Sequence, residues 1–276
     1  MRRLHILLSV LIITGFVGYR QRESDEIKGH LIIIGGGKPP AAVIQKFIDL
    51  AGGPKAKIAV IPMASSEPKK SGKSLEEEFL ELGVGKAKSY YIQDSFQANA
   101  DPVLDRLSNA SGIYFSGGDQ NRLTEIFCDT RCMELFHRMY KDGAVIGGNS
   151  AGAAIMSEVM ITGEGNWEVL KADSVVTTRG FGFIKRAIID QHFVARNRFN
   201  RLLAVSIQKR KMGIGIDENA AIWVKPGRQV EVLGEGTVLL IDPAEADFPV
   251  DTRRHLLGVK GLRLSVLHAG DRFTLE

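Results

Sequence analysis

The amino-acid sequence predicts one mixed α/β domain whose sheet is mainly parallel, flanked by helices, and continued by antiparallel strands near the C-terminus. Throughout residues 30–160, short apolar runs alternate with segments of helical pattern, which is typical of βαβ units and of a sheet buried on both faces. After residue 220, apolar and polar residues alternate, with turns at KPGR and GEG, which predicts antiparallel hairpins. No linker, repeat or low-complexity segment follows residue 30, so residues 29–276 are assigned to a single domain.

Each element is predicted from its own pattern. The first strand, HLIIIGGG, begins at His30 and is stopped by glycines. The next segment starts with Pro39 and Pro40 and ends in glycines, the order expected at the two ends of a helix. The remaining strands are KIAVIP, AKSYYIQ, GIYFSGG, AVIGG, AIIDQHF and GIGID, and the remaining helices are SLEEEFLELG, DPVLDRLSNA with Asp101 as N-cap, one or two helices over residues 121–141, and one following the AIIDQHF strand.

Composition excludes several classes of protein. The 276 residues are 44% apolar and 25% charged, which suits a packed soluble core. The formal net charge is only +4 and no basic patch is interleaved with aromatic residues, so we expect no nucleic-acid partner. Cys128 and Cys132 have no histidine nearby and form a poor metal site, so free thiols are expected, with a short-loop disulfide as the alternative in an exported protein. We expect neither a metal nor an organic cofactor.

The N-terminus has the pattern of a targeting segment. Arg2 and Arg3 precede an apolar run from Ile6 to Val17, which is short for a membrane span and suits a signal peptide. A first strand or buried helix is the alternative, and the charged stretch that follows the run disfavours it. The cleavage signal is weak, so residues 1–28 are predicted to be a signal peptide or a retained anchor. We therefore expect an exported protein, secreted or periplasmic.

The most informative stretch is GAVIGGNSAGAAIMSE, residues 143–158, where a strand pattern turns sharply into a helical one. Residues 148–152 satisfy G-x-S-x-G, in which small residues let strand and helix approach while a serine takes a strained turn. The pattern favours Ser150 as a nucleophile, with the Ala151 N–H directed at a developing oxyanion. The alternative is an anion-binding loop or a glycine-rich turn with a serine N-cap.

A serine nucleophile needs a base and an acid that orients it. His192 is the best placed of the six histidines because it ends the buried run RAIIDQH, although a hydrogen-bonded boundary residue is the alternative. For the acid, Glu218 at the end of GIGIDEN is favoured over Glu168, and the sequence leaves both open. Asp190 is too close in sequence to His192 to orient it easily.

Arg196, Arg198 and Arg201 follow the predicted base within a few residues. Arginine forks bind carboxylates bidentately, so the cluster is interpreted as a subsite for an acidic substrate. A solvated helix face is the alternative.

Two glycine-rich turns belong to the same predicted cleft. In FSGGDQNRL, Gly117 and Gly118 allow close approach of the backbone to a ligand, and one of their N–H groups is a candidate second oxyanion donor. The alternative is an ordinary turn capped by Asp119. IIIGGGKPP lacks the G-x-G-x-x-G spacing of a dinucleotide site and is interpreted as a turn near the cleft.

Four stretches together resemble the serine peptidase family that includes cyanophycinase and aspartyl dipeptidase: FSGGDQNRL, GGNSAGAAIMS, DQHFVARNRFNRL and GIGIDENAA. The resemblance spans roughly Leu31 to Val224. It implies a flavodoxin-like fold related to class I glutamine amidotransferases, with Ser150 as nucleophile, His192 as base and either Glu168 or Glu218 as acid. The positions that it links to substrate binding are Gln120, Asp190, Gln191, Arg196, Arg198, Arg201 and Asn219.

The resemblance implies a serine-type exopeptidase that hydrolyses cyanophycin to β-Asp-Arg dipeptides. Cyanophycin is a poly-aspartate chain with arginine on each side-chain carboxyl, so the expected partner is a polypeptide rich in aspartate and arginine. The family also implies a homodimer, and Asn149 stands where threonine is a common family choice. The alternatives are an aspartyl or isoaspartyl dipeptidase of the same fold, or a non-catalytic amidotransferase-like binding module.

Overall fold

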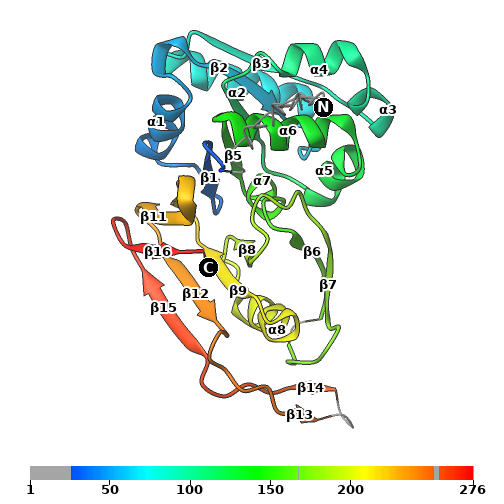
Figure 1. Cartoon of the computed structure of the whole chain (residues 1–276), viewed down its shortest axis with the longest axis vertical. Coiled ribbons are helices and arrows are strands. Elements are labelled where there is room, and N and C mark those ends of the chain that lie inside the picture. The colour runs from blue at the N-terminus through cyan, green and yellow to red at the C-terminus, as the bar shows by residue number, and fades with distance from the viewer. Residues whose placement is uncertain (1–25, 167, 252–254, 276) are drawn as a thin grey trace, which may run out of the picture.

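The computed structural model describes residues 26–166, 168–251 and 255–275. The predicted targeting segment therefore lies largely outside the described residues, because it falls mostly on residues 1–25. The first half of the chain forms a helix-covered sheet and the second half a β-rich part beside it, with α7 (Ala151–Ala154) at their junction (Figure 1). The mixed α/β fold predicted from the sequence is confirmed.

The larger sheet has eight strands in the order β16-β11-β10-β1-β5-β4-β2-β3. The five strands from β1 to β3 in this order are parallel, whereas β10, β11 and β16 continue the sheet in antiparallel fashion. The bounds are β1 His30–Ile34, β2 Lys57–Ile61, β3 Lys86–Ser89, β4 Gly112–Phe115, β5 Val145–Asn149, β10 Ala220–Val224, β11 Gln229–Gly234 and β16 Arg272–Thr274.

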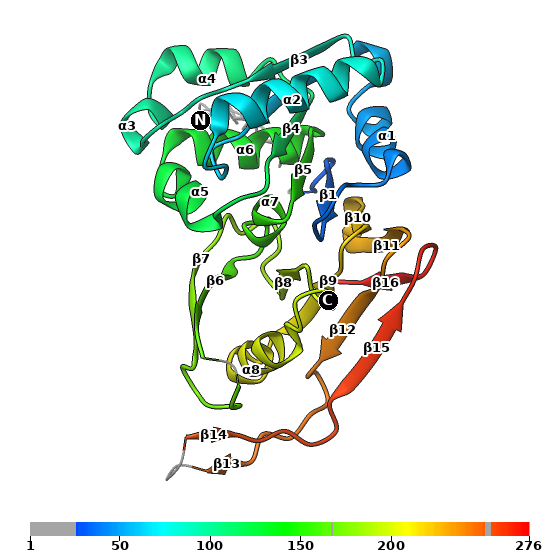
Figure 2. The same cartoon turned by 180° about the vertical axis from the view of Figure 1, so that it is seen from behind.

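Helices cover both faces of the parallel part because its strands are apolar on both sides. On β1, Ile32 and Ile34 pack with α1 and α2, while Leu31 and Ile33 pack with α5 and α6. The α6 side faces the viewer in Figure 1 and the α2 side in Figure 2. The bounds are α1 Ala41–Leu50, α2 Pro68–Glu81, α3 Ser95–Ala98, α4 Asp101–Leu107, α5 Gln120–Phe127 and α6 Arg131–Asp142.

One detail of helix capping differs from the prediction. Ala100 is the N-cap of α4, and Asp101 lies inside its first turn, where a negative charge faces the positive end of the helix dipole. Asp119, in contrast, caps α5 and accepts a hydrogen bond from the backbone N–H of Asn121 at 2.9 Å. The segment 121–141 contributes two helices, α5 and α6.

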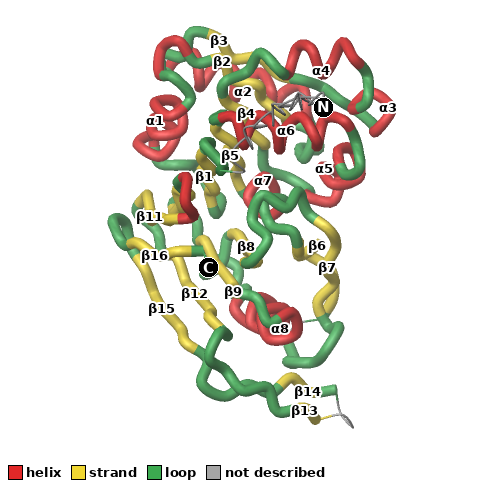
Figure 3. The backbone as a smooth tube through the Cα atoms, in the orientation of Figure 1, coloured by secondary structure: helices red, strands yellow, loops and turns green. Residues whose placement is uncertain are grey.

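A second sheet has the order β15-β12-β9-β8. Its strands β8 (Ala187–Gln191) and β9 (Met212–Ile216) are parallel, and β12 (Val238–Asp242) and β15 (Arg263–Leu267) are antiparallel. Helix α8 (Phe199–Lys209) packs on one face of this sheet, and Figure 3 shows that strands and loops dominate this part of the molecule.

The predicted second hairpin is wrong. β10 and β11 do form a hairpin, but after the GEG turn β12 pairs with β9 and β15 rather than with β11. The turn is held by the carbonyl of Asn219, which accepts hydrogen bonds from the backbone N–H groups of Glu235 and Gly236. The chain is thereby directed out of the larger sheet and into the second one.

Two small ribbons complete the described structure. β6 (Val159–Gly165) pairs with β7 (Val175–Arg179), and β13 (Val250–Asp251) pairs with β14 (Leu256–Leu257). Within the described ranges, no helix combines the length and apolar character needed to cross a membrane.

Candidate active site

Ser150 lies at the turn between β5 and α7 in a backbone conformation that serine rarely adopts. Its φ is 54° and its ψ is −106°, the strained geometry of a nucleophile on a strand-to-helix turn. The two flanking glycines are required by contact, since a β-carbon on Gly148 would lie 2.3 Å from the Gly152 oxygen. One on Gly152 would lie 2.3 Å from the Phe115 oxygen. The G-x-S-x-G pattern therefore forms the tight turn predicted from the sequence.

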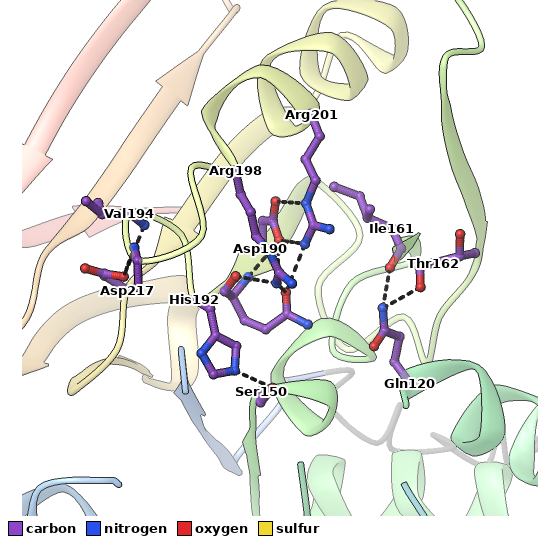
Figure 4. Close-up of polar contacts among 12 residues, drawn as sticks. Gln120, Ser150, Ile161, Thr162, Asp190, His192, Val194, Arg198, Arg201 and Asp217 are labelled. Carbon is purple, nitrogen blue, oxygen red and sulfur yellow. Dashed lines mark hydrogen bonds and ion pairs between the residues drawn. The ribbon is translucent and has the colours of Figure 1, made fainter. Parts of the chain in front are cut away.

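His192 reaches this serine from the second sheet. It follows β8 directly, has a φ of 48°, and is held by a hydrogen bond from its backbone N–H to the Gly35 oxygen at 2.7 Å. Its Nε2 lies 2.8 Å from Ser150 Oγ. Figure 4 shows the imidazole directed at the serine from the end of β8. The side chain is 9% exposed, so the hydrogen bond is shielded from water.

Glu218 completes a chain of three groups. Its Oε1 lies 2.6 Å from His192 Nδ1, and its side chain is 39% exposed. Glu218 follows β9 in the connection to β10, at the strand end from which the sequence analysis favoured it. Glu168 instead lies exposed in the β6–β7 connection, where its backbone N–H donates to Asn166 Oδ1 and no hydrogen bond to His192 is formed within the described residues.

The surroundings of His192 favour the neutral imidazole. Burial lowers its pKa most, and the positive charges of Arg196 and Arg198 lower it further, whereas the hydrogen bond and charge of Glu218 raise it; the net direction is downward. A neutral imidazole with Nδ1–H directed at a carboxylate has its Nε2 lone pair free to accept the serine proton. The electrostatics therefore suit a general base.

Backbone donors gather beside Ser150 Oγ. The N–H groups of Ala151, Gly117 and Gly118 find no acceptor within the described part of the chain. Gly117 lies against the serine, because a β-carbon built on it would be 3.4 Å from Ser150 Cβ. Gly118 has a φ of 138°, and a β-carbon there would lie 2.1 Å from the Ala64 oxygen. Glycine is thus needed at Gly118 for its backbone conformation and for space.

The arginine cluster divides into two kinds. Arg201 and Asp190 form a buried ion pair, with side chains 2% and 1% exposed, so the structure locates them beneath the site rather than in contact with solvent. Arg198 donates from Nη1 to the Gln191 carbonyl oxygen and Oε1, and burial lowers its pKa to about 10. Figure 4 shows Asp190 between Arg198 and Arg201. Arg196 alone is exposed, with no side-chain hydrogen bond to the described residues.

The other predicted binding residues also have structural partners. Gln120 is 7% exposed, and its Nε2 donates to the carbonyl oxygens of Ile161 and Thr162 at 2.9 and 2.8 Å (Figure 4). Asn219 is exposed, and its backbone N–H donates to the Gly36 oxygen. The Gln120 contacts connect the start of α5 to β6, and the Asn219 contact connects the β9–β10 loop to the turn after β1.

Two residues that sequence reasoning missed support the histidine. A β-carbon on Gly36 would lie 2.3 Å from His192 Cε1, so the glycine turn after β1 packs directly on the imidazole. Asp217 Oδ1 accepts the backbone N–H groups of Val194 and Ala195, which fixes the turn after His192 (Figure 4). The triple glycine was visible in the sequence, but its contact partner lies over 150 residues away.

The cysteines are free. Burial raises the pKa of Cys132 to about 11 and also raises that of Cys128, so neither is activated as a thiolate. Among the described residues, no group of three or more His, Cys, Asp or Glu side chains is arranged to hold a metal ion.

A mixed α/β fold with serine, histidine and glutamate in one hydrogen-bonded chain is the arrangement of hydrolases that use a nucleophilic side chain. The model of peptidase family S51 matches residues 31–232. The chain belongs to this family and is therefore a peptidase.

Comparison with known proteins agrees with this assignment. The chain is 35% identical over 258 residues to the cyanophycinase of Synechococcus elongatus, covering 90% of this chain and 80% of that one. It is 36% identical over 262 residues to the cyanophycinase of Trichormus variabilis, covering 92% and 88%. The crystal structure of a peptidase from an acI-B1 Actinobacterium superposes with a TM-score of 0.69 at 23% identity, covering 91% and 98%, and so shows the shared fold.

Proposed function

We propose that this protein is a serine-type exopeptidase that hydrolyses cyanophycin to β-Asp-Arg dipeptides. The observation that carries the proposal is the hydrogen-bonded chain from Ser150 Oγ through His192 to Glu218, with distances of 2.8 and 2.6 Å. The identity of 34–36% to cyanophycinases supports the substrate. The roles follow from this arrangement.

In the proposed mechanism, Ser150 Oγ attacks an aspartyl backbone carbonyl while His192 Nε2 takes the hydroxyl proton. Glu218 accepts the hydrogen bond from His192 Nδ1–H and stabilises the imidazolium that forms. The oxyanion accepts hydrogen bonds from the Ala151 N–H and from the N–H of Gly117 or Gly118. His192 then returns its proton to the leaving amine, and a water activated by the same histidine hydrolyses the acyl-enzyme.

The deciding experiment incubates the purified full-length chain with insoluble cyanophycin beside a Ser150→Ala variant. Mass spectrometry should detect β-Asp-Arg released by the wild type and none released by the variant. Labelling with a fluorophosphonate should give one adduct, on Ser150. An unlabelled Ser150 together with absent release overturns the proposal and favours a binding module, whereas cleavage restricted to short aspartyl or isoaspartyl peptides favours the dipeptidase alternative.

We also propose that the protein is exported and forms a homodimer. The signal-like pattern of residues 1–28 supports export, and the family resemblance supports the dimer. Fractionation of expressing cells tests the location, and light scattering of the purified protein tests the dimer.

A further inference from the structure

A cavity of about 330 Å³ opens directly beside the serine turn. It is bounded by α2 on one side and by the ends of β4 and β5 on the other, and two of its lining residues, Gly117 and Asn149, border Ser150. The cavity is therefore within reach of a side chain on the residue that Ser150 attacks. Apart from Gly117, none of its lining residues has a role in the mechanism proposed above.

The lining has an unusual charge balance. Glu78 is the one acidic residue in this lining, no lysine, arginine or histidine lines it, and Glu78 forms no ion pair with any described residue. Burial raises the pKa of the Tyr114 phenol, and the nearby negative charge of Glu78 raises it further. An unpaired carboxylate in a concave surface favours a cationic guest.

Further polar residues line the same cavity. Asn149 Oδ1 is buried without a hydrogen-bond partner, while Asn149 Nδ2 donates to the Gly37 oxygen at 3.3 Å. A buried acceptor without a donor is unfavourable until a ligand supplies one. Three residues with hydroxyl groups, Ser71, Ser74 and Tyr114, also line the cavity. Tyr114 is fixed edge-on against Phe47 and Phe79, with ring centroids 5.5 and 5.3 Å apart.

We propose that this cavity is the subsite that binds the guanidinium of an arginyl branch of the substrate, with Glu78 as its counter-ion. The inference rests on the proposed function, because it assigns a place to one branch of the polymer. A guanidinium presents five N–H donors in a plane, which suits acceptors arranged around a cavity better than a compact ammonium does. Arg196 belongs to the segment that follows β8 of the second sheet, whereas the cavity is bounded by α2, which covers the larger sheet. A positive and a negative side chain therefore come from different parts of the fold, which suits the carboxylate and guanidinium of a β-Asp-Arg unit.

The test compares short β-Asp-Arg peptides with otherwise identical peptides that carry citrulline, whose side chain has nearly the same shape and no charge. The wild type should prefer the arginyl peptides by roughly 10- to 100-fold in kcat/KM, the range for a hydrogen-bonded charged pair. Glu78→Gln should remove most of this preference, mainly through KM, and should leave citrulline peptides unaffected. Glu77→Gln is the matched control, because Glu77 is exposed on the same helix and lies 3.7 Å from Lys73. An equal loss on both peptides, or no loss on either, overturns the inference.

A second variant and a binding measurement separate this inference from the proposed function. Ser74→Phe fills the cavity and should lower kcat/KM for arginyl peptides while unbranched aspartyl peptides are cleaved as before. If the wild type cleaves no peptide, the proposed function fails, and the subsite is then judged by calorimetry on the Ser150→Ala variant. Tighter binding of β-Asp-Arg than of β-Asp-citrulline supports the subsite, and equal affinity overturns it.

Discussion

Gly36 lies in direct contact with the imidazole of His192. A β-carbon at this position would approach His192 Cε1, Nδ1 and Nε2 to 2.3, 2.5 and 2.6 Å, and the φ of Gly36 is 138°. The neighbouring Gly35 oxygen accepts the His192 backbone N–H, and the Gly36 oxygen accepts the backbone N–H of Asn219. The turn after β1 therefore fixes both His192, the proposed base, and the loop that carries Glu218.

Gly36→Ala should lower kcat by about 100-fold or more, because displacing a catalytic group by about 1 Å has an effect of that size. The substitution displaces His192 from Ser150, so KM should change far less than kcat. Gly83→Ala is the control, because Gly83 also has a positive φ, 87°, with nothing within 4 Å of a built β-carbon. Steady-state kinetics on both variants check the prediction, and comparable losses in the two would contradict it.

Glu218→Gln should reduce kcat by roughly 10³- to 10⁴-fold, since the amide no longer stabilises the imidazolium. Glu168→Gln should leave kcat within about twofold of the wild type, because this exposed side chain forms no hydrogen bond or ion pair with the described residues. Kinetics on the two variants under one set of conditions decide between the acids. A larger loss in Glu168→Gln would reassign the role.

The pH profile should report the lowered pKa of His192. The proposed mechanism requires the neutral imidazole, so kcat/KM should rise with pH along a limb centred below the ordinary histidine value of about 6.5. Arg196→Ala removes a positive charge that lowers this pKa, so the limb should move to higher pH.

The direction in which the pH profile of Arg196→Ala moves decides the test. Added salt should make this movement smaller, because it screens the charge. Arg186→Ala is the matched control, because Arg186 precedes β8 whereas His192 follows it. A shift to lower pH in Arg196→Ala, or an equal shift in Arg186→Ala, would contradict the electrostatic account.

The Asp190–Arg201 pair should matter for stability more than its exposed counterparts. Asp190→Asn leaves a buried guanidinium without its counter-ion and should lower the free energy of unfolding by about 3–5 kcal/mol. Arg179→Ala breaks an ion pair with Asp129 whose side chains are 66% and 76% exposed, and should cost about 1 kcal/mol or less. Urea unfolding of both variants checks the contrast, which fails if the two losses are equal.

Local patterns in the sequence predicted the parts of the site that are fixed locally. The G-x-S-x-G turn located Ser150, and strand ends located His192 and Glu218, because apolar strands and glycine turns are short-range signals. The partition into two sheets was not predicted, since pairing of β12 with β9 rather than β11 depends on contacts between distant segments. The burial of Asp190 and Arg201 as an ion pair was not predicted either. A cluster of charged residues in a sequence does not indicate which of them form ion pairs in the folded protein.

The three side chains of the proposed triad come from different parts of the fold. Ser150 follows β5 of the larger sheet, His192 follows β8 of the second sheet, and Glu218 lies on the strand connection that passes from one sheet to the other. The catalytic rate therefore depends on how the two sheets are positioned relative to each other. A displacement of about 1 Å at their boundary would abolish most of the activity while each sheet kept its hydrogen bonds. On heating, catalysis should disappear before the circular dichroism of the chain begins to change.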